Sequence, residues 1–173
     1  MRSSLLIAVV FALMAGCGSG SESSPDAGPG EVDTLAESLA VWQEMKAADD
    51  GAYAYTRTFR SWTGYHSVTR FVVEDDMVVR RTFQGYDESD QLLDSFDEQG
   101  EEVGSTEGIT PVYTIDELYE VCRDEVLTKD PEANQIYLAF RDDGLLERCH
   151  YIPSGCQDDC SMGVDIASID FSL

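Results

Sequence analysis

Five cysteines are the residues of this chain with the most distinctive chemistry. Cys122, Cys149, Cys156 and Cys160 lie in the C-terminal half, and Cys17 lies close to the start. The four cysteines after Cys17 are an even number, which is typical of disulfide bonds if the chain is exported, as its first residues indicate below. We favour the pairs Cys122–Cys149 and Cys156–Cys160. The pairs Cys149–Cys160 and Cys122–Cys156 are the alternative, because spacing alone does not fix a connectivity.

A zinc site is the competing interpretation of the same residues, with His150 as a further ligand. Its spacing is irregular, since Cys156 and Cys160 form one Cys-x3-Cys pair and the sequence holds no second pair of that kind. The sequence also contains no Cys-x-x-Cys redox motif. Disulfides therefore remain the favoured interpretation, and we expect neither a metal nor a cofactor.

His66 and His150 are the two histidines of the chain. A Ser–His–Asp or Cys–His catalytic set would have to include one of them. The sequence contains no Gly-x-Ser-x-Gly elbow, no His-Glu-x-x-His motif and no glycine-rich phosphate loop. We therefore name no catalytic residue and expect a non-catalytic binding or accessory protein. A hydrolase that uses paired carboxylates is the competing class.

The charge balance excludes one large class of partners. The chain has 11 Lys and Arg against 34 Asp and Glu, a formal net charge of −23. Such a protein repels nucleic-acid phosphates, so we expect no nucleic-acid partner. Acidic residues crowd into 87–107, where carboxylate oxygens could bind a divalent cation. That range lacks the spacing of a calcium-binding loop, so a solvated acidic surface is favoured and a cation-binding protein is the alternative.

The basic residues are segregated from the acidic ones. The ranges 52–73 and 77–86 contain no Asp or Glu, and they hold half of the basic residues that follow Cys17, interleaved with aromatic residues. Arginine and aromatic side chains are enriched at recognition surfaces. The sequence therefore predicts a candidate binding surface made of Arg57, Arg60, Trp62, Arg80 and Arg81. The competing interpretation is that these arginines neutralise the acidic range 87–107 of their own chain.

The first residues have the features of an export signal. Arg2 precedes an uncharged apolar run over 5–14, which is too short to cross a membrane as a helix. The run ends at Met14-Ala15-Gly16-Cys17, which resembles the lipobox of bacterial lipoproteins. The resemblance implies a signal peptide over 1–16 and a lipidated Cys17. Acyl chains there would anchor the protein to the cell membrane or the outer membrane, with its domain in the periplasm or on the cell surface.

A Gly-, Ser- and Pro-rich range follows and predicts a flexible tether over 17–32, so the single domain is expected over 33–173. Thr34 and Thr114 each begin a Ser/Thr-x-x-Glu capping box ahead of apolar residues at helical spacing. Alternating apolar patterns after each helix predict three strands per cycle, over 53–59, 67–73, 77–83, 136–140, 145–152 and 164–171. We expect 87–107 to be a long loop or a short outlying hairpin.

These elements predict an α+β fold, in which two helices pack on one face of an antiparallel sheet. The repeated order of one helix and three strands indicates a tandem αβββ duplication. That architecture resembles the proteinaceous β-lactamase inhibitors, a likeness of fold that carries no function.

Four segments in the second half carry a more specific resemblance. They are Tyr113-Thr114-Ile115-Asp116-Glu117-Leu118-Tyr119, Cys122-Arg123-Asp124, Arg148-Cys149-His150-Tyr151 and Gly155-Cys156-Gln157-Asp158-Asp159-Cys160. Over roughly 40–171 the chain resembles a family of small bacterial lipoproteins known as a domain of unknown function. Many members carry a Cys-x-Cys near the first strand, where this chain has Arg60-Ser61-Trp62. The resemblance implies export and the fold, and it implies no activity. A protein of the cell envelope is the partner class we expect, together with the membrane through the lipid.

Overall fold

The structure is a computed structural model that describes residues 29–173. The predicted signal peptide over 1–16, the predicted lipidation site Cys17 and most of the predicted tether lie outside the described residues. The first helix, α1, spans Pro29–Ala48, so it begins inside the range predicted as tether. The Thr34 capping box is a wrong prediction, because the Thr34 hydroxyl donates to the carbonyl of Gly30 at 2.7 Å, one turn back within the helix.

The N-terminal helix is followed by a four-stranded antiparallel meander. Its strands are β1 (Tyr53–Arg60), β2 (His66–Glu74), β3 (Met77–Tyr86) and β4 (Leu92–Gln99). β4 and the short 3-10 turn Gly100–Glu102 occupy the range 87–107, where the sequence analysis expected a loop or a short outlying hairpin. β4 belongs to the main sheet, because it pairs with β3 from Arg80 to Tyr86.

The second half repeats the order of one helix and four strands. The helix α2 spans Ile115–Val121 and continues as a π-helical turn over Cys122–Val126. The strands that follow are β5 (Asn134–Phe140), β6 (Leu146–Pro153), β7 (Met162–Asp165) and β8 (Ser168–Asp170). The Thr114 capping box is confirmed, since its hydroxyl accepts from the Glu117 amide while the Glu117 carboxylate accepts from the Thr114 amide. Each half has four strands, where three were predicted.

The strands form two antiparallel sheets that share one continuous segment. The larger sheet has the order β4-β3-β2-β1-β8, and the smaller has the order β5-β6-β7. The chain passes from β7 to β8 through Ile166 and Ala167, whose amides donate to Glu147 of β6 and Thr56 of β1, both at 2.8 Å. The last strand of the second half thus completes the sheet of the first half.

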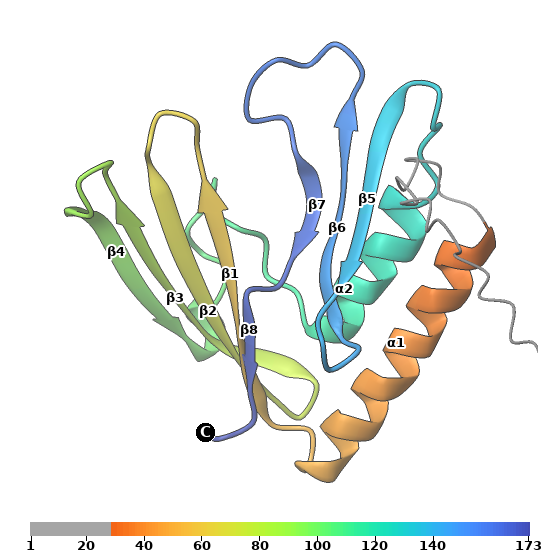
Figure 1. Cartoon of the computed structure of the whole chain (residues 1–173). Coiled ribbons are helices and arrows are strands. Elements are labelled where there is room, and N and C mark those ends of the chain that lie inside the picture. Colours follow the sequence, from red (N-terminus) through yellow and green to blue (C-terminus); the bar gives the residue numbers. More distant parts are fainter. Residues whose placement is uncertain (1–28) are drawn as a thin grey trace, which may run out of the picture.

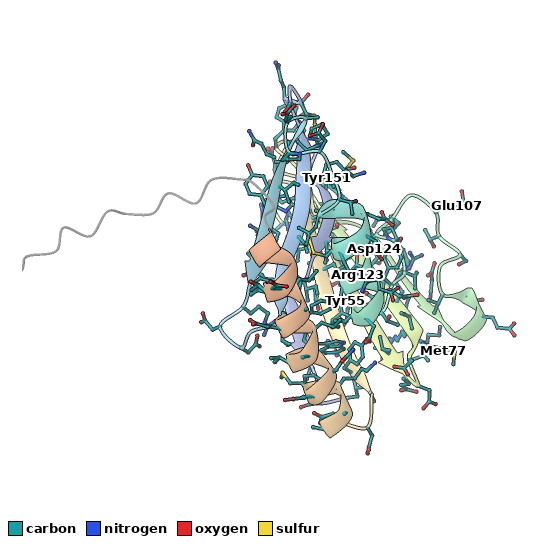
Figure 2. All side chains as sticks on the ribbon, turned by 90° about the vertical axis from the view of Figure 1, so that its right-hand side faces the viewer. Tyr55, Met77, Glu107, Arg123, Asp124 and Tyr151 are labelled. Carbon is teal, nitrogen blue, oxygen red and sulfur yellow. A yellow bond between two sulfur atoms is a disulfide. The ribbon has the colours of Figure 1, made fainter. Side chains whose placement is uncertain are left out.

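Both helices lie on the same side of the sheets, as Figure 1 shows, and the α+β fold with helices on one face is confirmed. The core fills the layer between them. Tyr53 and Tyr55 of β1 contribute buried rings, and Trp42 of α1 meets Tyr53 edge to face at 4.7 Å between ring centroids. Figure 2 shows Tyr55 in this interior, whereas Met77 and Glu107 lie at the periphery.

A disulfide ties the second helix to the smaller sheet. Cys122 in the π-helical turn is bonded to Cys149 of β6, and both residues are fully buried. The second disulfide joins Cys156 and Cys160 in the exposed loop between β6 and β7. This is the connectivity favoured from the sequence. Two disulfides indicate an oxidising compartment, as expected of an exported protein.

Candidate functional site

The candidate site is a cleft between the two sheets, where β1 and β7 separate. β2 pairs with β1 along its whole length, but β8 covers the opposite edge only from Ala54 to Thr56. Beyond Thr56 that edge faces β7 across a cavity of about 610 Å³. Figure 1 shows β1 and β7 diverging from the point where β8 lies against β1. The volume falls within the range of about 300–1,000 Å³ typical of ligand pockets.

Arg57 of β1 spans the inner end of this cleft. Its Nε donates to the carbonyl of Asp165 at 3.3 Å, and its Nη2 donates to the carbonyl of Gly163 at 3.0 Å. These carbonyls lie on the edge of β7 that faces away from β6. The Ile166 amide donates to Glu147 of β6, and backbone groups of successive strand residues point alternately to the two sides, so those of Asp165 and Gly163 point away from β6. Burial lowers the pKa of Arg57, although a guanidinium stays protonated at neutral pH.

Arg60 and Arg148 supply two more guanidinium groups to the cleft walls. Arg60 stands at the exposed end of β1, and Arg148 of β6 contacts the Asp165 carboxylate at 3.4 Å. His150, the next residue on that face of β6, also lines the cleft. Burial and the charge of Arg148 lower the pKa of His150, which favours the neutral form of its ring. The positive charge of the cleft therefore comes mainly from its arginines.

The turn between β1 and β2 closes the outer end of the cleft. Asp159, from the loop held by the Cys156–Cys160 disulfide, accepts from the Ser61 hydroxyl at 2.5 Å and from the Trp62 amide at 3.2 Å. The Trp62 side chain is 76% exposed beside this contact. Phe59 is also exposed, with its ring 6.3 Å from that of Tyr65. Of these aromatic residues, Phe59 lines the cleft together with the arginines.

The absence of carboxylate partners distinguishes two of these arginines. Among the basic residues that the structure describes, Arg57, Arg60 and Lys129 make no ion pair. Lys129 lies over the ring of Tyr151 at 4.8 Å, away from the cleft. The two arginines without a carboxylate partner thus line the same cavity, in a chain with about three acidic residues for each basic one.

Two of the five residues predicted as a binding surface line the cleft, namely Arg57 and Arg60. Trp62 is exposed and does not line it, although its backbone amide contacts the lining residue Asp159. Arg80 and Arg81 are adjacent on β3, so their side chains leave opposite faces of the sheet. Arg80 pairs with Asp97 on the exposed face. Arg81 is buried against Glu98, and it is therefore not a surface residue.

Arg80 and Arg81 pair with Asp97 and Glu98. These two ion pairs agree with the competing interpretation from the sequence, in which arginines neutralise the acidic range 87–107. Arg81 donates through Nε and Nη2 to the two carboxylate oxygens of Glu98 at 2.8 and 2.9 Å. It also donates to the carbonyls of Thr106 and Thr110 at 2.9 and 3.2 Å. This buried pair holds the segment between β4 and α2, and Thr110 of that segment lines the cleft.

Arg148, His150 and Asp159 are cleft residues that the sequence analysis did not place there. Each lies more than eighty residues from Arg57 in the sequence, in the other half of the chain. Arg148 and His150 share a face of β6 because they are two residues apart, a spacing that could have grouped them with each other. Their approach to β1 depends on how β8 joins the sheets, which no local pattern encodes.

The remaining candidates from the sequence have structural surroundings. The Nε2 of His66 lies 3.2 Å from Asp90, and its ring stacks on Tyr86. The four cysteines that would have formed a zinc site are paired with each other. Within residues 29–173, no cluster of three or more His, Cys, Asp or Glu side chains is arranged to hold a metal ion. Neither α1 nor α2 has both the length and the apolar composition of a membrane-spanning helix.

Comparisons with protein-family models, with curated proteins and with solved structures found no match for this chain. The resemblance to small bacterial lipoproteins therefore stays a prediction from the sequence.

Proposed function

We propose that this chain is a lipid-anchored, non-catalytic binding protein of the cell envelope, and that its cleft between β1 and β7 receives an acidic group of a partner. The observation that carries the proposal is the location of Arg57 and Arg60. Both arginines lack a carboxylate partner among the described residues, and both line this cavity.

The electrostatic argument compares this cleft with the rest of the molecule. A protein with a formal net charge of −23 repels an acidic ligand over most of its surface. The cleft is lined by three arginines, and the carboxylates of Asp159 and Asp165 reduce their combined charge. An acidic group is therefore attracted at this site and disfavoured elsewhere. This difference in charge between the cleft and the remaining surface restricts the position and the orientation in which a partner docks.

Placement at the membrane rests on the first residues of the sequence. The lipobox-like Met14-Ala15-Gly16-Cys17 and the tether after it would hold the domain a short distance from the lipid surface. The disulfides support an oxidising compartment. Intact-mass measurement of the membrane-extracted protein tests the anchor, because acyl chains add their mass to Cys17. A chain with an unmodified Cys17 would refute the lipid anchor.

Binding of defined peptides tests the recognition site. A panel of fluorescent five-residue peptides rich in Asp and Val is titrated with the full-length chain, beside a panel in which Asn replaces Asp. We expect affinity for the acidic panel, a fall in that affinity with added salt, and a loss of about tenfold with Arg60→Gln. Arg123→Gln is the matched control, since Arg123 is also exposed but pairs with Asp124 in the π-helical turn that follows α2 (Figure 2). Equal binding of both panels, or equal effects of the two substitutions, would refute the site.

A further inference from the structure

The cleft contains a free strand edge as well as arginines. Backbone groups along an antiparallel strand point alternately to its two neighbours. The Thr56 carbonyl accepts from Ala167 on the β8 side, whereas the Ser61 amide bonds Tyr65 on the β2 side. Every second residue of the strand points to the same side, so the N–H and C=O groups of Thr58 and Arg60 point to the same side as those of Thr56, which beyond β8 is the cleft. Neither residue has a backbone partner there among the described residues.

The two ends of this open stretch are already occupied. Below it, β8 pairs with β1 through Thr56. Above it, the next amide that points the same way, that of Trp62, donates to the carboxylate of Asp159. Across the cleft, the Gly163 and Asp165 carbonyls on the free edge of β7 are taken by Arg57. The carbonyls on the β7 edge are thus occupied, whereas both the N–H and the C=O groups of Thr58 and Arg60 on β1 are open.

The open stretch of β1 also has the regular geometry that an added strand requires. The β1–β2 ladder runs from Tyr53 to Arg60 without a bulge, whereas the β2–β3, β3–β4 and β5–β6 ladders each contain a register shift. Of the devices that protect a free edge from pairing, this stretch has neither a bulge nor a proline; its charged residues are arginines, which attract an acidic segment. β7 stands on the other side of the cleft, so a single extended segment fits better than the broad edge of a second sheet.

From these features, and resting on the proposed function, we propose that the partner's acidic segment binds in extended form and adds a strand to β1, in line with β8. Its backbone pairs with Thr58 and Arg60, and its acidic side chain meets the Arg60 guanidinium. Strand addition of this kind takes its affinity from main-chain hydrogen bonds and its specificity from side-chain contacts. The bond between Asp159 and the Trp62 amide is an internal precedent for a carboxylate on this edge.

Amide hydrogen exchange on the full-length chain gives a direct readout. The Thr58 and Arg60 amides should exchange fast in the free protein and slow by at least about tenfold when an acidic pentapeptide from the panel is bound. The Arg57 and Phe59 amides are the internal control, because their alternate direction points them to β2 and they are protected without a ligand. Binding of the acidic peptide with no change at Thr58 and Arg60 would overturn strand addition.

A second variant pair separates backbone pairing from charge. Thr58→Pro removes the N–H that faces the cleft, and proline is tolerated on a free edge, whereas Thr58→Val keeps the N–H. The expected loss of peptide affinity is about tenfold for Thr58→Pro, and little for Thr58→Val. If Thr58→Pro fails to fold, methylation of the peptide's own backbone nitrogens tests the same bonds in the unchanged protein.

The outcomes distinguish the two proposals. If Arg60→Gln weakens binding but Thr58→Pro and peptide methylation do not, the acidic site stands and strand addition is refuted. If methylation abolishes binding but Asp and Asn peptides bind alike, strand addition stands without the acidic partner. If sodium succinate binds at Arg60 while no acidic peptide does, a small anion is the ligand and strand addition is overturned.

Discussion

Replacing Glu98 with Gln tests whether the buried ion pair holds the segment between β4 and α2. The side chains of Arg81 and Glu98 are 2% and 6% exposed. The carboxylate accepts from Arg81 and from the amides of Gly104 and Thr106, both at 2.8 Å. Removing one partner of a buried pair leaves an uncompensated charge, which costs about 3–5 kcal/mol. We expect Glu98→Gln to lower the free energy of unfolding by that amount at pH 7.

The contribution of Glu98 to the free energy of unfolding depends on pH. Hydrogen bonds from Arg81 and the loop hold the pKa of Glu98 well below its ordinary value of 4.5. A carboxyl group whose pKa is lower in the folded state stabilises the protein fully above its unfolded pKa. That contribution is lost as the pH falls through the folded pKa. The difference in stability between the wild type and Glu98→Gln should therefore be constant above about pH 6 and shrink in acid below about pH 4.

Urea unfolding, monitored by tryptophan fluorescence, measures these differences in the free energy of unfolding. The dependence of that free energy on urea concentration should be the same in each variant, so that a shift in midpoint reports a change in stability. The matched control is the double variant Arg81→Met with Glu98→Leu, which removes both charges together. It removes the unpaired charge that Glu98→Gln leaves, but it also takes the partners from the loop amides and carbonyls that the pair holds, so it should recover only part of the lost stability. A loss below about 1 kcal/mol for Glu98→Gln, or a difference that does not change with pH, would refute the reasoning.

Three further predictions concern the two halves of the molecule. Replacing Cys122 and Cys149 together with Ser should lower the free energy of unfolding by about 3–4 kcal/mol, since their disulfide closes a loop with a sequence separation of 27; a urea midpoint equal to that of the wild type would contradict this. Thr114→Ala should cost about 1 kcal/mol in the same assay through the lost cap of α2, and Thr114→Ser should restore it. Asp159→Asn should raise the affinity for an acidic peptide twofold to about fivefold by removing a like charge from the cleft. Asp158→Asn, the same change of charge outside the cleft lining, should have a smaller effect in the same titration.

Local patterns predicted most of the elements and missed the way they are joined. The apolar positions Leu118 and Cys122 of the second helix are buried as their spacing indicated. β4 was missed because its acidic residues have low strand propensity. Asp97 and Glu98 are tolerated there because Arg80 and Arg81 of β3 lie next to them, a pairing between strands that only the register shows.

The candidate site was predicted to the extent that it lies on one strand. Arg57 and Arg60 stood out from the sequence because their surroundings contain no acidic residue, and both lie in the cleft. Alternation alone could have separated Arg80 from Arg81, since neighbours on a strand face opposite sides. Arg148 and Asp159 come from the second half, and their place opposite β1 depends on the crossing of the chain from β7 to β8.

The distribution of partners among the basic residues links the fold to the proposed function. In a chain this acidic, a guanidinium at the surface usually meets a carboxylate of its own molecule, as Arg70, Arg123 and Arg141 do. Arg57 instead bonds two strand carbonyls, and Arg60 stands at the end of an open edge. The divergence of β1 and β7 creates both conditions, because it opens the edge of β1 beyond Thr56 and leaves the two arginines on the walls of the gap. A carboxylate that enters this cleft therefore meets positive charge and free backbone groups together, which is the combination that strand addition by an acidic segment requires.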